Sequence, residues 1–434
     1  MPEFFTMRFL QHPRLFLSLL AVLVMAFGLQ ALQPSSLKRP PVNRFPYKEM
    51  GLTDQQAAAH LLNRFTFGPR PGEVEAVVKM GLESWFEQQL AGNQPDPLVA
   101  EKLNGYDILT MNNQQIVDAF PKPLQVARMA KAAGYIKDDS LQVRDEKKYK
   151  EQVRAFAQEK NFRRQAELFR QFINAKIIRS AYSNNQLKEV LTDFWFNHFN
   201  LSLTKRTCAL FVPNYERDAI RPNATGSFEN LLLATAKSPA MLVYLDNFTS
   251  AGKNDDFDDD RVARKLEKAK ERLADGDTAA RMQIQRLQKA QQNKGLNENY
   301  AREVMELHTL GVDGGYTQSD VTEAARVLTG WTMYPLEDGP GTQYRNMIKR
   351  FGEENLIQRG FVHDGDFFFA INRHDSKPKT VLGKRFDGKG GYQEGVELLH
   401  LLAHHASTAR FISRKLAVRF VSDEPPAALV EKMA

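Results

Sequence analysis

The sequence predicts a mainly α-helical protein: one multi-helical domain with few short strands and an inserted, charged helical hairpin. Apolar residues recur at spacings of three and four over most of the chain, which is typical of amphipathic helices. Alternating strand patterns are scarce, and the best candidates are Phe367–Ile371 and Thr380–Phe386. The 434 residues are 42% hydrophobic, so the chain can bury a sizeable core and wholesale disorder is excluded.

The N-terminal segment, residues 1–34, has the pattern of a membrane-targeting element. Arg8 and Arg14 precede an apolar run from Leu15 to Leu29, which suits a cleaved signal peptide or an uncleaved membrane anchor. In either case we expect export of the rest of the chain, because no second apolar stretch follows. The expected location is therefore the cell envelope, in the periplasm or on the membrane.

A Pro-rich linker, residues 35–52, leads into the predicted helical domain, residues 53–434. Thr53 is a typical N-cap for the first helix, Gly/Pro pairs at 68–72 end it, and two further short helices extend to Leu90. A long amphipathic pattern covers residues 153–190, and a helical pattern with a basic end covers 394–420. The chain stops within what looks like another helix, so we expect a truncated C-terminus.

Charge is unevenly distributed along the chain. Lys+Arg 59 against Asp+Glu 52 gives a net charge of +7, and the basic excess is concentrated between Lys137 and Arg179, where acidic residues are interleaved as on a solvated helix face. Residues 253–294 are also highly charged, and two helical patterns flank a turn at 274–277, which predicts the inserted hairpin. No nucleic-acid-binding motif occurs, so we expect no nucleic-acid partner. The single Cys208 excludes a disulfide scaffold.

Residues 299–311 carry the first candidate site, on a predicted helix that ends at its glycine. Glu303 and Glu306 share a polar stripe, next to an apolar stripe that includes Leu307. Two carboxylates one turn apart can bind a divalent cation, or can share a proton and serve as acid and base. The alternative is an ordinary polar helix face on which Arg302 neutralises Glu306.

Histidines carry the remaining candidate chemistry. Glu397, His400 and His404 lie on one helix face at the Glu-x-x-His spacing used by metal sites in helical bundles, although a short spacing of this kind also arises by chance. His374 and Asp375 are adjacent in a loop, where such a pair is a base, a ligand pair or a capped turn.

His198 lies in the aromatic segment Phe194–Phe199, for which a hydrogen-bonded core histidine is the ordinary interpretation. No Gly-rich phosphate loop, nucleophile elbow or His-Glu-x-x-His motif occurs. The sequence therefore leaves the cofactor open, with a divalent metal as its one candidate beside a metal-free acid–base site.

Several segments together resemble the bacterial domain-of-unknown-function family 1800, from about Asp54 to the C-terminus. The resembling segments are Ala58–Gly68, Trp195–Phe199, Met241–Asn247, Asn297–Trp331, His374-Asp375 with Lys379, and His405–Leu416. The positions that match the family motifs are Asn197, His198, Glu303, Glu306, His308, His374, Asp375 and His405, whereas Glu397, His400 and His404 match none. The resemblance implies a mainly helical exported protein without an established reaction, often encoded beside a second exported family of phosphatase- or sulfatase-like ancestry.

Two functional hypotheses follow. The first is an envelope enzyme with Glu303, Glu306, His374 and Asp375 as catalytic residues, in which the carboxylates share a proton or a divalent metal is bound. The candidate metal ligands are Glu303, Glu306, His198, His308 and His405. The second is a non-enzymatic, membrane-tethered scaffold that docks an exported partner of the phosphatase- or sulfatase-like family through the hairpin and the basic face between Lys137 and Arg179. Burial of Glu303 and Glu306 would favour the enzyme, because buried carboxylates need a partner or a metal.

Overall fold

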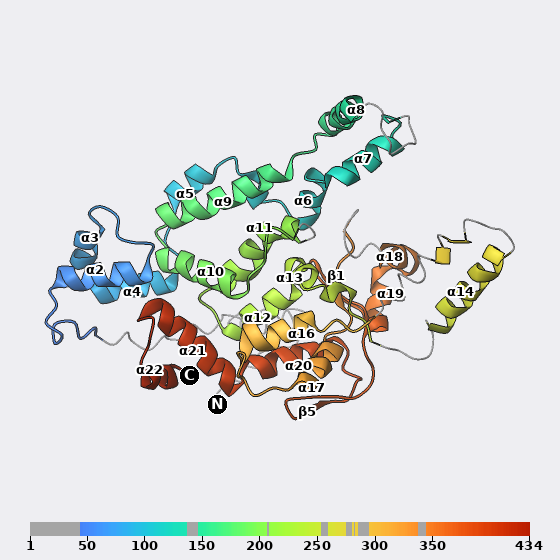
Figure 1. Cartoon of the computed structure of the whole chain (residues 1–434). Helices are drawn as coiled ribbons and strands as arrows, with labels where there is room; N and C mark the ends of the chain where they lie inside the picture. The colour runs from blue at the N-terminus through green and yellow to red at the C-terminus, as the bar shows by residue number, and fades with distance from the viewer. Residues whose placement is uncertain are drawn as a thin grey trace, which may run out of the picture. The chain divides into compact units, whose positions relative to one another are not determined.

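The computed structural model describes residues 44–136, 146–205, 208–252, 259–274, 280–281, 283–284, 295–336 and 344–434. In this part of the chain, helices dominate and strands are few and short, which confirms the predicted mainly α fold (Figure 1). Tyr47–Ala434 is one compact unit. The predicted targeting segment, 1–34, and the linker as far as residue 43 lie outside the described residues. None of the described helices has the length and apolar character needed to span a membrane.

The N-terminal helices follow the predicted order. The Thr53 hydroxyl accepts a hydrogen bond from the Gln56 backbone N–H at 3.2 Å, and the Gln56 side chain accepts one from the Thr53 N–H at 2.9 Å. This reciprocal capping box fixes the start of the first helix and confirms Thr53 as its N-cap. The helices here are α2 (Asp54–Phe65), α3 (Glu73–Met80), α4 (Leu82–Ala91) and α5 (Pro97–Leu103).

The long amphipathic pattern at 153–190 corresponds to three helices. The chain breaks after α8, where Asn161 adopts a φ of 54°, and again at Ser183, which is extended. Hydrophobic spacing continues through both breaks, so it does not reveal them. The helices of this region are α6 (Asn113–Ala119), α7 (Pro123–Ala132), α8 (Glu146–Glu159), α9 (Gln165–Tyr182) and α10 (Gln186–His198).

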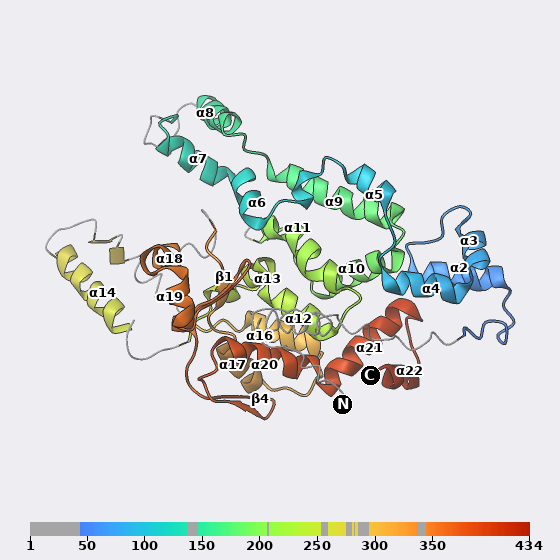
Figure 2. The same cartoon turned by 180° about the vertical axis from the view of Figure 1, so that it is seen from behind.

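The main hydrophobic core lies among helices from the middle and the end of the chain. α12 (Phe228–Lys237), α13 (Pro239–Tyr244), α17 (Gln318–Val327) and α20 (Tyr392–Ala403) contribute to it, and Figures 1 and 2 show α17 beside α20 in both views. Trp331 is fully buried against α20. A Cβ at Gly395 would lie 2.4 Å from the Trp331 ring, so only glycine permits this approach.

The strands form two small antiparallel sheets. β1 (Trp331–Met333), β3 (Phe367–Phe369) and β2 (Val362–Asp364) pair in that order. The predicted strand Thr380–Phe386 is wrong as a single strand: it is a hairpin of β4 (Lys379–Val381) and β5 (Lys384–Phe386). The turn residues Leu382 and Gly383 both have positive φ, 50° and 79°, which reverses the chain.

The predicted helix at 299–311 begins as α16 (Asn299–Glu303) and continues as the π-helix η6 (Val304–Thr309). The Leu310 N–H donates to the Met305 carbonyl, five residues back, at 2.8 Å. The wider turn changes which side chains face the core. Leu307, expected on the apolar stripe, is 47% exposed, and His308 is buried in its place.

The remaining elements complete the chain. Helix α14 (Asp259–Ala274) covers the first arm of the predicted hairpin, while the turn and most of the second arm lie outside the described residues. The other α-helices are α11 (Val212–Asn214), α18 (Arg345–Phe351), α19 (Glu353–Gln358), α21 (Ala406–Phe420) and α22 (Ala427–Met433). A second π-helix, η3, covers Tyr215–Ile220. Short 3-10 turns occupy Asp107–Leu109, Ala209–Phe211, Arg221–Asn223, Asn247–Thr249 and Ile371–Arg373.

Candidate functional site

Predicted site residues from distant segments meet at one cavity of about 690 Å³. His198 comes from the end of α10, Glu303 and His308 from the α16–η6 helix, and Lys415 from α21. We call these four residues the cavity cluster. The rest of the wall is formed by Asn197, Asn200, Lys205, Tyr244, Leu245, Asp246, Asn299, Leu307 and Phe411. Most of this lining is polar, and three of its residues are asparagines.

His198 is held by both of its ring nitrogens. Nε2–H donates to the His308 carbonyl oxygen at 2.9 Å, and Nδ1 accepts from Lys415 Nζ at 2.8 Å. A carbonyl can only accept, so the hydrogen bonds place the proton on Nε2. Burial, followed by the charge of Lys415, lowers the pKa of His198 to about 3, so the ring is neutral near pH 7.

Lys415 reaches the cavity from α21 without a carboxylate partner among the described residues. Its Nζ bonds to the neutral His198 ring and lies 5.3 Å from the centre of the Phe411 ring. Burial lowers the pKa of Lys415, because desolvation disfavours the charged amine. The sequence carried a signal for this residue: Lys415 follows Phe411 and Ile412 by one helical turn on the inward-facing side of α21.

Glu303 is the carboxylate of the cavity cluster. Burial, and then the nearby charge of Glu306, raise its pKa, whereas Arg302 has a smaller opposing effect. Glu303 and Glu306 are both half-buried, so the burial criterion does not separate the two functional hypotheses. Glu306 accepts a hydrogen bond from the Tyr316 hydroxyl at 3.2 Å. The expected Arg302–Glu306 pair is wrong: Arg302 lies 3.5 Å from Glu298, one turn earlier.

His308 and His405, the other candidate metal ligands, have different surroundings. His308 lines the cavity from a buried position, and burial, followed by His198 and Lys415, lowers its pKa to about 3. His405 is the N-cap of α21, where its Nδ1 accepts from the Ser407 N–H at 3.1 Å. The five predicted ligands do not converge on a common point within the described residues.

His374 and Asp375 do not line the cavity. They belong to what we call the buried network, which joins α17, β4 and α20 through Arg326, His374, Asp375, Lys379 and Glu394. Lys379, whose side chain is 0% exposed, lies 2.6 Å from Glu394 Oε2, and that oxygen is also 3.2 Å from His374 Nε2. The glutamate further accepts from the backbone N–H groups of Gly388 and Gly390.

Every charge in the buried network therefore has a counter-charge. Arg326 holds Asp375 with two hydrogen bonds of 2.9 and 3.1 Å. Burial works against ionisation of Asp375, but the bonds from Arg326 and the Lys377 N–H outweigh it and lower its pKa. Burial also lowers the pKa of His374, and its Nδ1 lies 3.0 Å from the Thr329 carbonyl. The arrangement is that of a network that holds elements together.

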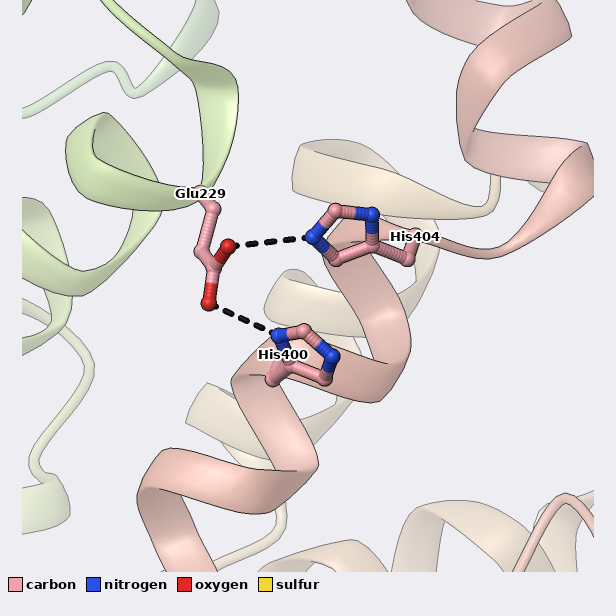
Figure 3. A group of neighbouring side chains, drawn as sticks. All are labelled: Glu229, His400 and His404. Carbon is pink, nitrogen blue, oxygen red and sulfur yellow. Dashed lines mark hydrogen bonds and ion pairs between the residues drawn. The ribbon is translucent and has the colours of Figure 1, made fainter.

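The Glu-x-x-His face of α20 does not form the predicted group. Glu397 pairs with Lys384 at 3.0 Å. His400 and His404 instead contact Glu229, which α12 supplies from a distant part of the sequence (Figure 3). Of the described His, Cys, Asp and Glu residues, these three alone bring ligand atoms close enough to share one ion.

Comparison with known proteins identifies the family of the chain. No curated protein and no solved structure matches it. The family model described as "Protein of unknown function (DUF1800)" matches residues 60–434, which include the cavity cluster, the buried network and the main core. The chain belongs to the DUF1800 family.

Proposed function

We propose that this protein is an enzyme of the cell envelope that performs acid–base catalysis in the cavity lined by Glu303, His198 and Lys415. One observation carries the proposal. Two titratable groups line the same cavity, the Glu303 carboxylate with a raised pKa and the Lys415 amine with a lowered pKa. Opposite shifts of this kind bring both groups towards neutral pH, where an acid and a base exchange protons most efficiently.

The residues divide the chemistry as follows. Glu303 takes or gives a proton at the reacting group, since its carboxyl faces the cavity. Lys415 supplies the second proton or stabilises negative charge that develops on the substrate. His198 acts on Lys415 as a positioning residue, because its Nδ1 fixes the amine at 2.8 Å while its other nitrogen is held by the backbone.

The wall of the cavity favours a substrate rich in hydroxyl or amide groups. Asn200 and Asn299 each bring an amide group that can donate and accept hydrogen bonds, and Asn197 brings its side-chain oxygen, since its amide nitrogen donates to Asp193. The one ion pair in the wall, Lys205 with Asp246 at 2.9 Å, is internally neutral. An uncharged polar substrate suits such a lining better than a strongly charged one.

The envelope location rests on the sequence of residues 1–34, where basic residues precede an apolar run. Export would bring the cavity into contact with the glycan and peptide material outside the cytoplasm. Fractionation of cells that produce the chain, with detection of the protein in membrane, periplasmic and cytoplasmic fractions, tests this part of the proposal separately.

The enzymatic part is tested with substrate fractions prepared from bacterial envelopes. Purified protein is incubated with glycan and peptide fractions, and new products are followed by mass spectrometry. Glu303→Gln and Lys415→Met should each abolish product formation while the circular dichroism spectrum and the unfolding midpoint stay close to those of the parent. Glu354→Gln, which changes an exposed carboxylate away from the cavity, is the matched control. Product formation that survives both cavity variants would refute the proposal.

A second candidate, the scaffold that docks an exported partner, is favoured by the exposed charge of α14. Lys268, Lys270, Glu271 and Arg272 are all exposed on this helix. Charge reversal at the three basic positions should release a phosphatase- or sulfatase-like partner in a pull-down from the native host. If the partner is lost and no envelope fraction yields a product, the scaffold replaces the enzyme as the preferred function.

A further inference from the structure

Two histidines at the C-terminal end of α20 and one glutamate of α12 meet on the protein surface (Figure 3). None of the three lines the cavity. His400 Nδ1 lies 2.8 Å from Glu229 Oε1, and His404 Nε2 lies 3.0 Å from Glu229 Oε2. The two imidazole rings are 4.4 Å apart between centroids. Two nitrogen donors and one carboxylate therefore point into the same small space.

This donor set suits a transition metal ion. Two imidazoles and one carboxylate, with a fourth position left to water, form a recurring set of zinc ligands. Ligand atoms around a tetrahedral zinc ion are about 3.3–3.5 Å apart, because the metal–ligand distances are about 2.0–2.2 Å. Here one ligand atom of each residue lies within 4.8 Å of the others. Small side-chain rotations therefore close the site.

The three side chains have the freedom to make those rotations. Their exposed fractions are 58% for His400, 61% for His404 and 38% for Glu229, so no packed neighbour holds the rings in place. The backbone, in contrast, is fixed. His400 and His404 are one helical turn apart at the end of α20, and Glu229 lies in the first turn of α12, which packs against α20 in the main core.

Local electrostatics also favours a cation. The Glu229 carboxylate supplies an oxygen to each of the two imidazoles. The C-terminal end of a helix carries a partial negative charge, and both histidines lie at that end of α20.

We propose that Glu229, His400 and His404 bind one zinc ion, with solvent water in the remaining coordination position. The ion replaces the protons that now lie between the two rings and the carboxylate. Bound zinc links α12 to α20 and presents an open coordination position to solvent. The competing description is a hydrogen-bonded cluster that holds no metal.

The experiment is a calorimetric titration of the full chain, purified without a histidine tag and without chelator, with Zn²⁺ as the probe. We expect one zinc ion per chain and a rise in the midpoint of thermal unfolding when zinc is present. The double variant His400→Ala/His404→Ala should lose this binding, and Glu229→Gln should weaken it by roughly 10- to 100-fold, because a neutral amide is a poorer ligand than a carboxylate.

Three matched variants keep the result specific. His60→Ala removes an exposed helical histidine elsewhere, and Glu397→Gln removes a carboxylate one turn before His400. Both should bind zinc as the parent does. Glu303→Gln should also retain it; loss of zinc there would place the metal in the cavity and overturn the assignment. The assignment is also overturned if the double histidine variant still binds zinc, or if the parent binds no stoichiometric zinc. In either case the three residues form only a hydrogen-bonded cluster without a metal.

Discussion

Two clusters in this protein each bring a lysine amine against a histidine ring, and they differ in what completes them. In the buried network, Lys379 Nζ lies 3.4 Å from His374 Nε2 and 2.6 Å from the carboxylate of Glu394. In the cavity cluster, Lys415 Nζ lies 2.8 Å from His198 Nδ1 with no carboxylate bound to it among the described residues. Lys379 is therefore paired with a carboxylate inside the fold, whereas the amine of Lys415 can still bind a negatively charged or polar group of a ligand.

The contrast separates a structural role from a chemical one. A fully paired, buried ion cluster stabilises one arrangement of the chain and has no unpaired charge with which to bind a substrate. Lys415 faces the cavity, and the neutral His198 ring fixes the position of its amine without balancing its charge. His374 and Asp375 belong with the first kind, so the acid–base chemistry that we propose rests on Glu303 and Lys415 and not on them.

The strongest test of this contrast is Lys379→Met. The change leaves Glu394 buried without its closest counter-charge, and removal of one partner from a buried pair costs about 3–5 kcal/mol. Urea unfolding of variant and parent measures the difference in free energy of unfolding. The double variant Lys379→Met/Glu394→Gln should recover part of the loss, because no buried charge then remains. A cost below about 1 kcal/mol would remove the distinction between the clusters.

Acid should weaken the protein through the histidines of the cavity cluster before it titrates the carboxylates of the buried network. His198 and His308 have folded-state pKa values of about 3, below the unfolded value of about 6.5, so the unfolded state takes up protons first as the pH falls. Their contribution is complete above about pH 6.5 and is lost between there and pH 3. Between pH 7 and pH 5.5, protonation of these two histidines in the unfolded state should lower the free energy of unfolding by about 2–3 kcal/mol. Urea unfolding at the two pH values measures the difference.

The carboxylates of the buried network give the control for that experiment. The folded-state pKa values of Asp375 and Glu394 are lowered, so the stability that they contribute is present above their unfolded values of about 4 and is lost only in stronger acid. Asp375→Asn should therefore leave the loss between pH 7 and 5.5 unchanged. His198→Asn should reduce it by about half.

Lys415→Met should lower the free energy of unfolding by about 1–2 kcal/mol, less than Lys379→Met, because it leaves behind a neutral acceptor, His198 Nδ1, and not a buried charge. The same comparison can be made on the parent with an amine-reactive reagent at pH 8, read by mass spectrometry of peptides. Lys415 should be modified faster than a typical surface lysine, and Lys379 should be protected. Equal labelling of the two lysines would contradict their different environments.

The smallest expected effect concerns His405. His405→Ala removes the side-chain cap of α21 and should cost about 0.5 kcal/mol in unfolding free energy. His405→Asn should restore the stability, because asparagine caps helices well. A metal-binding role would give a different pattern, since asparagine would not restore metal content.

The predictable part of the fold came from local signals. Thr53 marked a helix start, and hydrophobic spacing identified helical regions near both ends of the domain, at α2 to α4 and at α20 and α21. The π-helix at Val304–Thr309 was not predictable, because its hydrophobic pattern fits an α-helix equally well. The β4–β5 turn was missed because Leu382 is a residue that rarely adopts positive φ, and its N–H is held by Asp320 from α17.

The candidate site was accessible to sequence reasoning only in pieces. His198, Glu303 and His308 were identified individually, and the cavity now groups them. Their grouping with Lys415 depends on the packing of α21 against η6, which no local pattern reports. The partner of His400 and His404 was out of reach for a similar reason. Glu229 is 171 residues from His400, and the nearby Glu397 fitted the expected spacing.

The π-helical turn at Val304–Thr309 contains one residue more than an α-helical turn would at the same place in the helix. Such a turn behaves as an insertion that the helix absorbs by widening, at a cost in hydrogen-bond geometry. A chain shortened by Leu307 would regain an ordinary α-helix over this segment, and the residues on both sides of the widened turn would keep their directions, because the turn had absorbed the extra residue. Only the residues inside the turn would change which of them faces the cavity. The widened turn therefore places His308 beside His198 without altering the course of the helix around it.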